Sequence, residues 1–157
     1  MTDCQTLRTL IVDDSEDECI LLRAELRHVP SIDLIGFVHD GVEALAYIQG
    51  VNNFKDRESF PYPDLILLDY QMPRRDGMQV LQQLRHQLHR PHVILWSNTL
   101  DRLNVPQAMR LGADLVCEKP CNKSGLLEIL NHFRMKIFNH ISVPPCRTAA
   151  EPAHVGD

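Results

Sequence analysis

Five side chains whose chemistry suits phosphoryl transfer follow short apolar runs that could form buried strands: Asp13, Asp14, Asp69, Ser97 and Lys119. Functional groups gather at the carboxyl ends of the strands in an open parallel sheet, so we expect these side chains at one sheet edge. Carboxylates brought together raise each other's pKa unless a cation intervenes, and Mg²⁺ prefers such oxygen ligands. The Lys119 amine can neutralise a carboxylate or a phosphoryl oxygen, and Ser97 offers a hydroxyl donor. The set suits phosphoryl transfer, in which a carboxylate can itself be the nucleophile.

The elements that must position these groups are short apolar runs alternating with longer segments of helical periodicity. Strands are predicted at residues 7–12, 32–38, 65–68, 93–96 and 114–117, and a helical segment follows each of them. The run at 65–68 is wholly apolar, which is typical of a parallel strand buried on both faces. Five such units predict an α/β fold, a doubly wound five-stranded parallel sheet with helices on both faces.

Local signals set the expected helix boundaries. Ser15, with Glu18 three residues later, predicts a capping box at the start of the first helix. In the third helix, Val80, Leu84 and Leu88 recur at helical spacing and predict one buried face.

The chain length of 157 residues favours one compact domain. We expect this domain over residues 1–139. Residues 140–157 contain three prolines and no apolar period, so we expect a disordered tail there. Residues 51–63 are polar and predict a loop that is long for an α/β unit.

Charge and hydropathy exclude several classes of partner. The formal net charge is −5, which gives no electrostatic reason to expect direct nucleic-acid binding. No apolar run reaches the ~18 residues of a membrane span, and the N-terminus lacks the apolar stretch of a signal peptide. We therefore expect a cytoplasmic protein with no membrane partner. The five scattered cysteines do not resemble a disulfide framework.

The motifs, taken in order, resemble the receiver domain of two-component response regulators. The matching stretches are residues 10–14 (LIVDD), 64–77 (DLILLDYQMPRRDG), 93–97 (VILWS) and 112–120 (GADLVCEKP). The resemblance implies a flavodoxin-like (βα)5 receiver fold. It also implies a single-domain response regulator that acts as a signalling phosphoacceptor rather than an enzyme. Its output would be protein–protein contacts or a phosphorelay.

The resemblance implies a role for each residue of the site. Asp69 would accept the phosphoryl group from a phosphohistidine on a histidine kinase or a histidine phosphotransfer protein. Ser97 and Lys119 would contact the phosphoryl oxygens. Pro120 would hold Lys119 in place, in the family through a cis peptide bond.

The same resemblance implies a Mg²⁺ cofactor. Asp14 and Asp69 would bind the ion directly, with the backbone carbonyl of Gln71 as a third protein ligand. Asp13 would hold the ion through water or lie close beside it.

The sequence says less about how phosphorylation would be transmitted to a partner protein. Val116 stands where the family usually has an aromatic residue whose side-chain rotamer is coupled to the movement of the hydroxyl residue, here Ser97. Residues 99–138 are the expected surface for a downstream protein target or for a homodimer.

Three other functions remain as alternatives. A receiver-like scaffold that is never phosphorylated is disfavoured because all the site residues are present. An aspartyl-phosphate phosphohydrolase of the haloacid dehalogenase type needs Asp-x-Asp after the first strand, and residues 13–15 (DDS) lack that spacing. A nucleotide or flavin binder is disfavoured because no Gly-x-Gly-x-x-Gly or Walker loop follows that strand.

Overall fold

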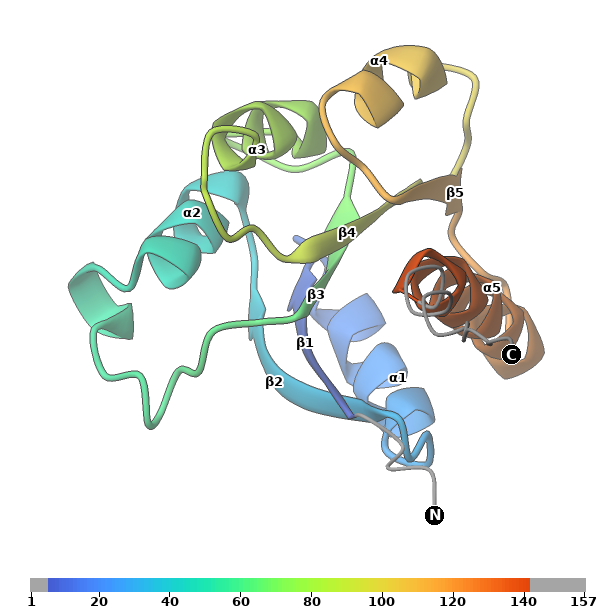
Figure 1. Ribbon diagram of the computed structural model, residues 1–157, viewed down its shortest axis with the longest axis horizontal. Helices are drawn as coiled ribbons and strands as arrows, with labels where there is room; N and C mark the ends of the chain where they lie inside the picture. Colours follow the sequence, from blue (N-terminus) through green and yellow to red (C-terminus); the bar gives the residue numbers. More distant parts are fainter. Residues whose placement is uncertain (1–5, 142–157) are drawn as a thin grey trace, which may run out of the picture. The chain divides into compact units, whose positions relative to one another are not determined.

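One parallel sheet of five strands organises the chain. The computed structural model describes residues 6–141, with side chains to residue 137. The strands are β1 (Leu7–Val12), β2 (Ile32–Val38), β3 (Leu65–Asp69), β4 (His92–Ser97) and β5 (Leu115–Glu118). They pair in the order β2-β1-β3-β4-β5, and every neighbouring pair is parallel (Figure 1). The predicted doubly wound α/β fold is confirmed.

A helix follows each strand, as predicted. The helices are α1 (Glu16–Leu26), α2 (Gly41–Gln49), α3 (Gly77–Leu84), α4 (Val105–Arg110) and α5 (Lys123–Ile141), with a short 3-10 helix η1 (Asn52–Phe54). Contacts divide the chain into two units, residues 1–119 and residues 120–157, which are described separately. The first unit holds the whole sheet and α1 to α4, and the second holds α5.

The expected buried face of the third helix is partly wrong. Val80 and Leu84 are fully buried, but α3 ends at Leu84 and the side chain of Leu88 is 96% exposed. The chain leaves the helix to reach the start of β4 at His92, so Leu88 falls outside the helical period.

The core of the first unit lies on both faces of the sheet. Leu65 to Leu68 of β3 are fully buried, as the wholly apolar run predicts. On one face, alternate residues of β1, β3 and β4 join a cluster with α2 and α3, which lie on that side of the sheet together with α4 (Figure 1). Helix α1 lies on the other side and buries Cys19, Leu22 and Leu26. These buried strands fix the positions from which the site residues project.

The loop at 51–63 is tied to the end of α2. The rings of Phe54 and Phe60 lie 5.1 and 5.9 Å from the ring of Tyr47, measured between centroids. The Arg57 guanidinium donates hydrogen bonds to the carbonyl oxygens of Tyr47 (2.8 Å), Ile48 (2.6 Å) and Phe60 (3.1 Å). Carbonyl groups at the end of a helix need such partners, so Arg57 makes this loop part of the α2 terminus.

The expected tail lies mostly outside the described residues. Helix α5 extends to Ile141, and residues 142–157 are not described. Within residues 6–141, no helix is long and apolar enough to cross a membrane.

Candidate functional site

Three aspartates meet at the carboxyl edge of the sheet. Asp13 and Asp14 follow β1, and Asp69 is the last residue of β3. Each offers a carboxylate oxygen, and these three oxygens lie within 4.8 Å of one another. Asp13 and Asp69 are buried, whereas Asp14 is exposed. Within the described part of the chain, this is the one group of three or more such side chains placed to hold a metal ion.

Lys119 joins this cluster from the end of β5. Its Nζ donates to Asp13 Oδ2 at 2.9 Å and to Asp69 Oδ2 at 3.2 Å. It also donates to Glu18 Oε2 at 2.5 Å, a contact that the sequence analysis missed. Burial alone would lower the pKa of Lys119, but hydrogen bonds to Glu18 and Asp13 and the charge of Asp69 raise it overall. Lys119 is therefore a fully charged ammonium held among three carboxylates.

Asp69 carries a strongly altered pKa. Burial raises it from 3.8 to about 6, and the nearby Asp13 carboxylate adds to the rise. The Lys119 ammonium and a hydrogen bond from the Gln71 backbone N–H, 3.1 Å from Asp69 Oδ1, act in the opposite direction without cancelling it. Ionising Asp69 is therefore costly in the metal-free site, and a cation beside it would relieve that cost.

Ser97 lies beside Asp69 at the end of the next strand. Asp69 pairs with Trp96 across β3 and β4, so Ser97 is one step further along the same edge, and it is buried. The Lys119 backbone N–H donates to the Ser97 carbonyl oxygen at 2.8 Å, which ties the end of β5 to that of β4.

The described residues contain no cis peptide bond, so the expectation of a cis bond before Pro120 is wrong.

The first helix starts with half of the predicted capping box. The Ser15 hydroxyl accepts the Glu18 backbone N–H at 3.3 Å, as expected. The Glu18 side chain does not return to Ser15, because it binds Lys119 instead. The Ser15 backbone N–H donates to Asp13 Oδ1 at 2.9 Å. A site carboxylate thus takes the place of the glutamate in closing the turn.

The loop after Asp69 returns tightly to the sheet. The Gly77 backbone N–H donates to the Tyr70 carbonyl oxygen at 2.9 Å. A Cβ atom at Gly77 would lie 2.7 Å from both the Asp69 carbonyl oxygen and Leu95 Cδ1. Only glycine permits this close approach. Asp76 caps α3 in a full capping box with Gln79.

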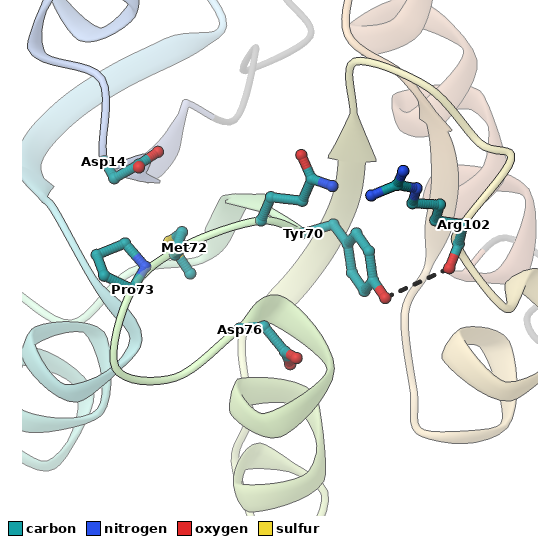
Figure 2. Close-up of a pocket in the computed structure, with 7 residues that line it drawn as sticks. Asp14, Tyr70, Met72, Pro73, Asp76 and Arg102 are labelled. Atoms are coloured by element: carbon teal, nitrogen blue, oxygen red, sulfur yellow. Dashed lines mark hydrogen bonds between the residues drawn. The ribbon is translucent and has the colours of Figure 1, made fainter.

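An open hollow of about 590 Å³ lies beside Asp14. Its lining residues are Asp14, Tyr70, Gln71, Met72, Pro73, Asp76 and Arg102 (Figure 2). The Tyr70 hydroxyl donates to the Arg102 carbonyl oxygen at 3.4 Å, which links the loop after β3 to the loop after β4 (Figure 2). The hollow therefore borders the carboxylate cluster at Asp14.

The chain belongs to the response regulator receiver domain family, whose model matches residues 9–131. It is 31% identical over 142 residues to a protein-glutamate methylesterase/protein-glutamine glutaminase of Trichodesmium erythraeum, covering 87% of this chain and 36% of that protein. Among solved structures it is similar to response regulator RPA3017 in red light signaling of R. palustris. That likeness has 32% identity and a TM-score of 0.67, and covers 94% of this chain and 100% of the other.

A second solved structure bears on the metal. The Mn(2+)-bound form of response regulator Rcp1 is 26% identical, with a TM-score of 0.63, and the match covers 94% of this chain and 99% of the other. The chain spans 36% of the length of the first curated relatives that it matches. The shared part is the receiver domain of two-component signalling.

Proposed function

We propose that Asp69 accepts a phosphoryl group from a phosphohistidine on a partner histidine kinase or phosphotransfer protein. The observation that carries the proposal is the contact of the Lys119 ammonium with Asp69 Oδ2, beside two further aspartates at the same sheet edge. An Asp69 oxygen would form the new O–P bond while the N–P bond of the phosphohistidine breaks. The electron pair of that bond returns to the imidazole nitrogen.

The proposed roles of the neighbouring groups follow from their charge and position. The Lys119 ammonium stabilises the negative charge that develops on the phosphoryl oxygens. Ser97, at the end of the adjacent strand, supplies a hydroxyl donor to one of those oxygens. Ser97 ends β4 and Lys119 directly follows the paired strand β5, so their backbones are held together before the phosphoryl donor arrives.

The carboxylate cluster fits a magnesium ion. Three carboxylate oxygens within 4.8 Å of one another form a hard-oxygen donor set of the kind that Mg²⁺ uses. We propose that Asp14, Asp69 and the Gln71 backbone carbonyl hold the ion, with Asp13 beside it or bound through water. When bound, Mg²⁺ would neutralise charge on the phosphoryl oxygens and on the carboxylates.

The chain would then serve as a signalling phosphoacceptor and not as an enzyme that acts on a separate substrate. A downstream protein would recognise the phosphorylated form, either through direct contacts or as the next member of a phosphorelay. The use of residues 99–138 as the recognition surface stays a prediction.

Incubation with acetyl phosphate and Mg²⁺, followed by intact-mass measurement, tests the assignment. The wild-type chain should gain the mass of one phosphoryl group, and Asp69→Asn should gain none. Asp76→Asn is the matched control, because Asp76 lines the same hollow but lies outside the carboxylate cluster. A wild type that gains no mass, or an Asp69→Asn variant that still does, would overturn the proposal.

A further inference from the structure

Glu18 is an additional carboxylate on the lysine of the site. It lies in α1, and its Oε2 atom is 2.5 Å from Lys119 Nζ. The other two partners of the ammonium, Asp13 and Asp69, belong to the aspartate cluster. Glu18 is not part of that cluster, and its side chain reaches the site through Lys119.

The three contacts use the full donor capacity of the lysine. An ammonium group has three N–H donors, and here each faces one carboxylate, on Asp13, Glu18 and Asp69. A phosphoryl oxygen that approaches Asp69 must therefore displace one of these carboxylates from Lys119. The exposed fractions of the side chains are 1% for Asp13, 6% for Asp69 and 38% for Glu18. Glu18 can turn to water when released, whereas the two buried aspartates cannot.

We propose that Glu18 is a positioning residue for Lys119, which it holds partly away from the aspartates in the metal-free site and withholds from the phosphoryl group in the phosphorylated site. While bound, it draws the ammonium away from the aspartates and adds negative charge, and both effects favour a cation in the cluster. It competes with the phosphoryl oxygens for the same ammonium, so it weakens the hold of the site on an anion. This role rests on the proposed function of Asp69 and Lys119.

The two effects predict opposite changes when the Glu18 charge is removed. In Glu18→Gln, Lys119 engages the aspartates more strongly, so Mg²⁺ should bind about three- to tenfold more weakly. The phosphoryl mimic beryllofluoride, measured at saturating Mg²⁺, should bind more tightly by a similar factor, because a neutral amide competes less strongly than a carboxylate for the ammonium. A structural role alone would weaken both affinities together.

Titrations of the full chain test this directly. Isothermal titration calorimetry gives the Mg²⁺ affinity, and fluorescence of Trp96, the single tryptophan, gives a second readout for both ligands. Glu16→Gln is the matched control, because it removes the same charge from the first turn of the same helix. Both affinities of this control should stay within about twofold of wild type. Affinities that change in the same direction, or not at all, in Glu18→Gln would overturn the positioning role.

The same substitution in a chain without Lys119 distinguishes an effect transmitted through the lysine from a direct effect of the Glu18 charge on the metal. In Lys119→Met, the effect of Glu18→Gln on Mg²⁺ affinity should shrink to less than about twofold, because the lysine that transmits it is gone. An undiminished effect would show that the charge acts through space, and would also overturn the proposal. Failure of the wild type itself to bind Mg²⁺ or beryllofluoride would instead refute the proposed function on which this inference rests.

Discussion

The cost of burying the Asp69 charge gives a stability prediction. Asp69→Asn keeps the shape of the side chain and removes the carboxylate charge. In buffer with EDTA, we expect this variant to be more stable than the wild type, although it cannot be phosphorylated. The gain arises because Asp69 is 5% exposed and lies beside the Asp13 carboxylate, and Lys119 only partly offsets these effects.

The magnitude and its pH dependence follow from the pKa of Asp69. Burial raises this pKa from 3.8 to about 6, so the folded chain loses the proton less readily than the unfolded chain. Below about pH 4 both states are protonated and the group costs nothing. As the pH rises from about 4 to about 6, the folded state loses about 3 kcal/mol relative to the unfolded state, and the loss is constant above that. Asp69→Asn should therefore gain up to about 3 kcal/mol at pH 7.5 and much less near pH 4.5.

Urea denaturation at both pH values, with EDTA and then with Mg²⁺, measures the difference. Mg²⁺ should reduce the difference in free energy of unfolding between Asp69→Asn and the wild type at pH 7.5. The wild type has one more charged ligand and gains more stability from the bound ion. Asp14→Asn is the control. Asp14 is exposed, so its replacement should change metal-free stability by less than about 0.5 kcal/mol while weakening Mg²⁺ binding. If Asp69→Asn is no more stable than wild type in EDTA, or if the gap does not depend on pH, the reasoning about the buried charge is wrong.

Three further perturbations test contacts in the loops and turns of the first unit. Arg57→Ala should lower the free energy of unfolding in urea by about 2 kcal/mol, because three backbone carbonyl groups lose a charged donor, and Arg57→Lys should recover little of it. Gly77→Ala should cost about 2 kcal/mol in the same assay and slow phosphorylation by acetyl phosphate, because the new methyl group pushes against the Asp69 backbone. Burial alone would raise the pKa of Asp40, but backbone N–H groups at the start of α2 and the Arg74 guanidinium lower it overall. Its stabilising effect is therefore present above about pH 4 and lost as the pH falls further, so Asp40→Asn should lower the melting temperature at pH 7 and have little effect at pH 3.

Much of the site could be predicted because each residue lies at the carboxyl end of a strand or just after it. A wholly apolar run such as 65–68 predicts a strand buried on both faces, and the residue after it must emerge at the sheet edge. The same reasoning placed Asp13 after β1 and Lys119 after β5, and the structure brings these residues together. Their roles in phosphoryl transfer stay predictions.

Glu18 could not be assigned in this way, because two interactions compete for the same side chain. Ser15 and Glu18 have the spacing of a capping box, a pattern that depends only on local sequence. The partner that takes the glutamate, Lys119, lies 101 residues further along the chain. A buried ammonium outcompetes a single backbone N–H for a carboxylate, because both partners are charged. The signal that could have identified Glu18 is its place in the first turn of a helix that begins directly after Asp13 and Asp14.

The rigidity of the strands determines where a phosphorylation signal can go. β1, β3 and β4 are held by paired backbone groups and mostly buried side chains, so Asp13 and Asp69 cannot move apart to relieve their repulsion. Phosphorylation of Asp69 would turn its carboxylate into an acyl phosphate and give Lys119 new acceptors, and the resulting rearrangement must fall on the loops at the sheet edge. Tyr70 lies in the first of these loops and donates to the Arg102 carbonyl in the second. Val116 packs partly buried against the core and has no aromatic ring to turn, so we expect Tyr70 to be the aromatic residue that responds to the state of Asp69.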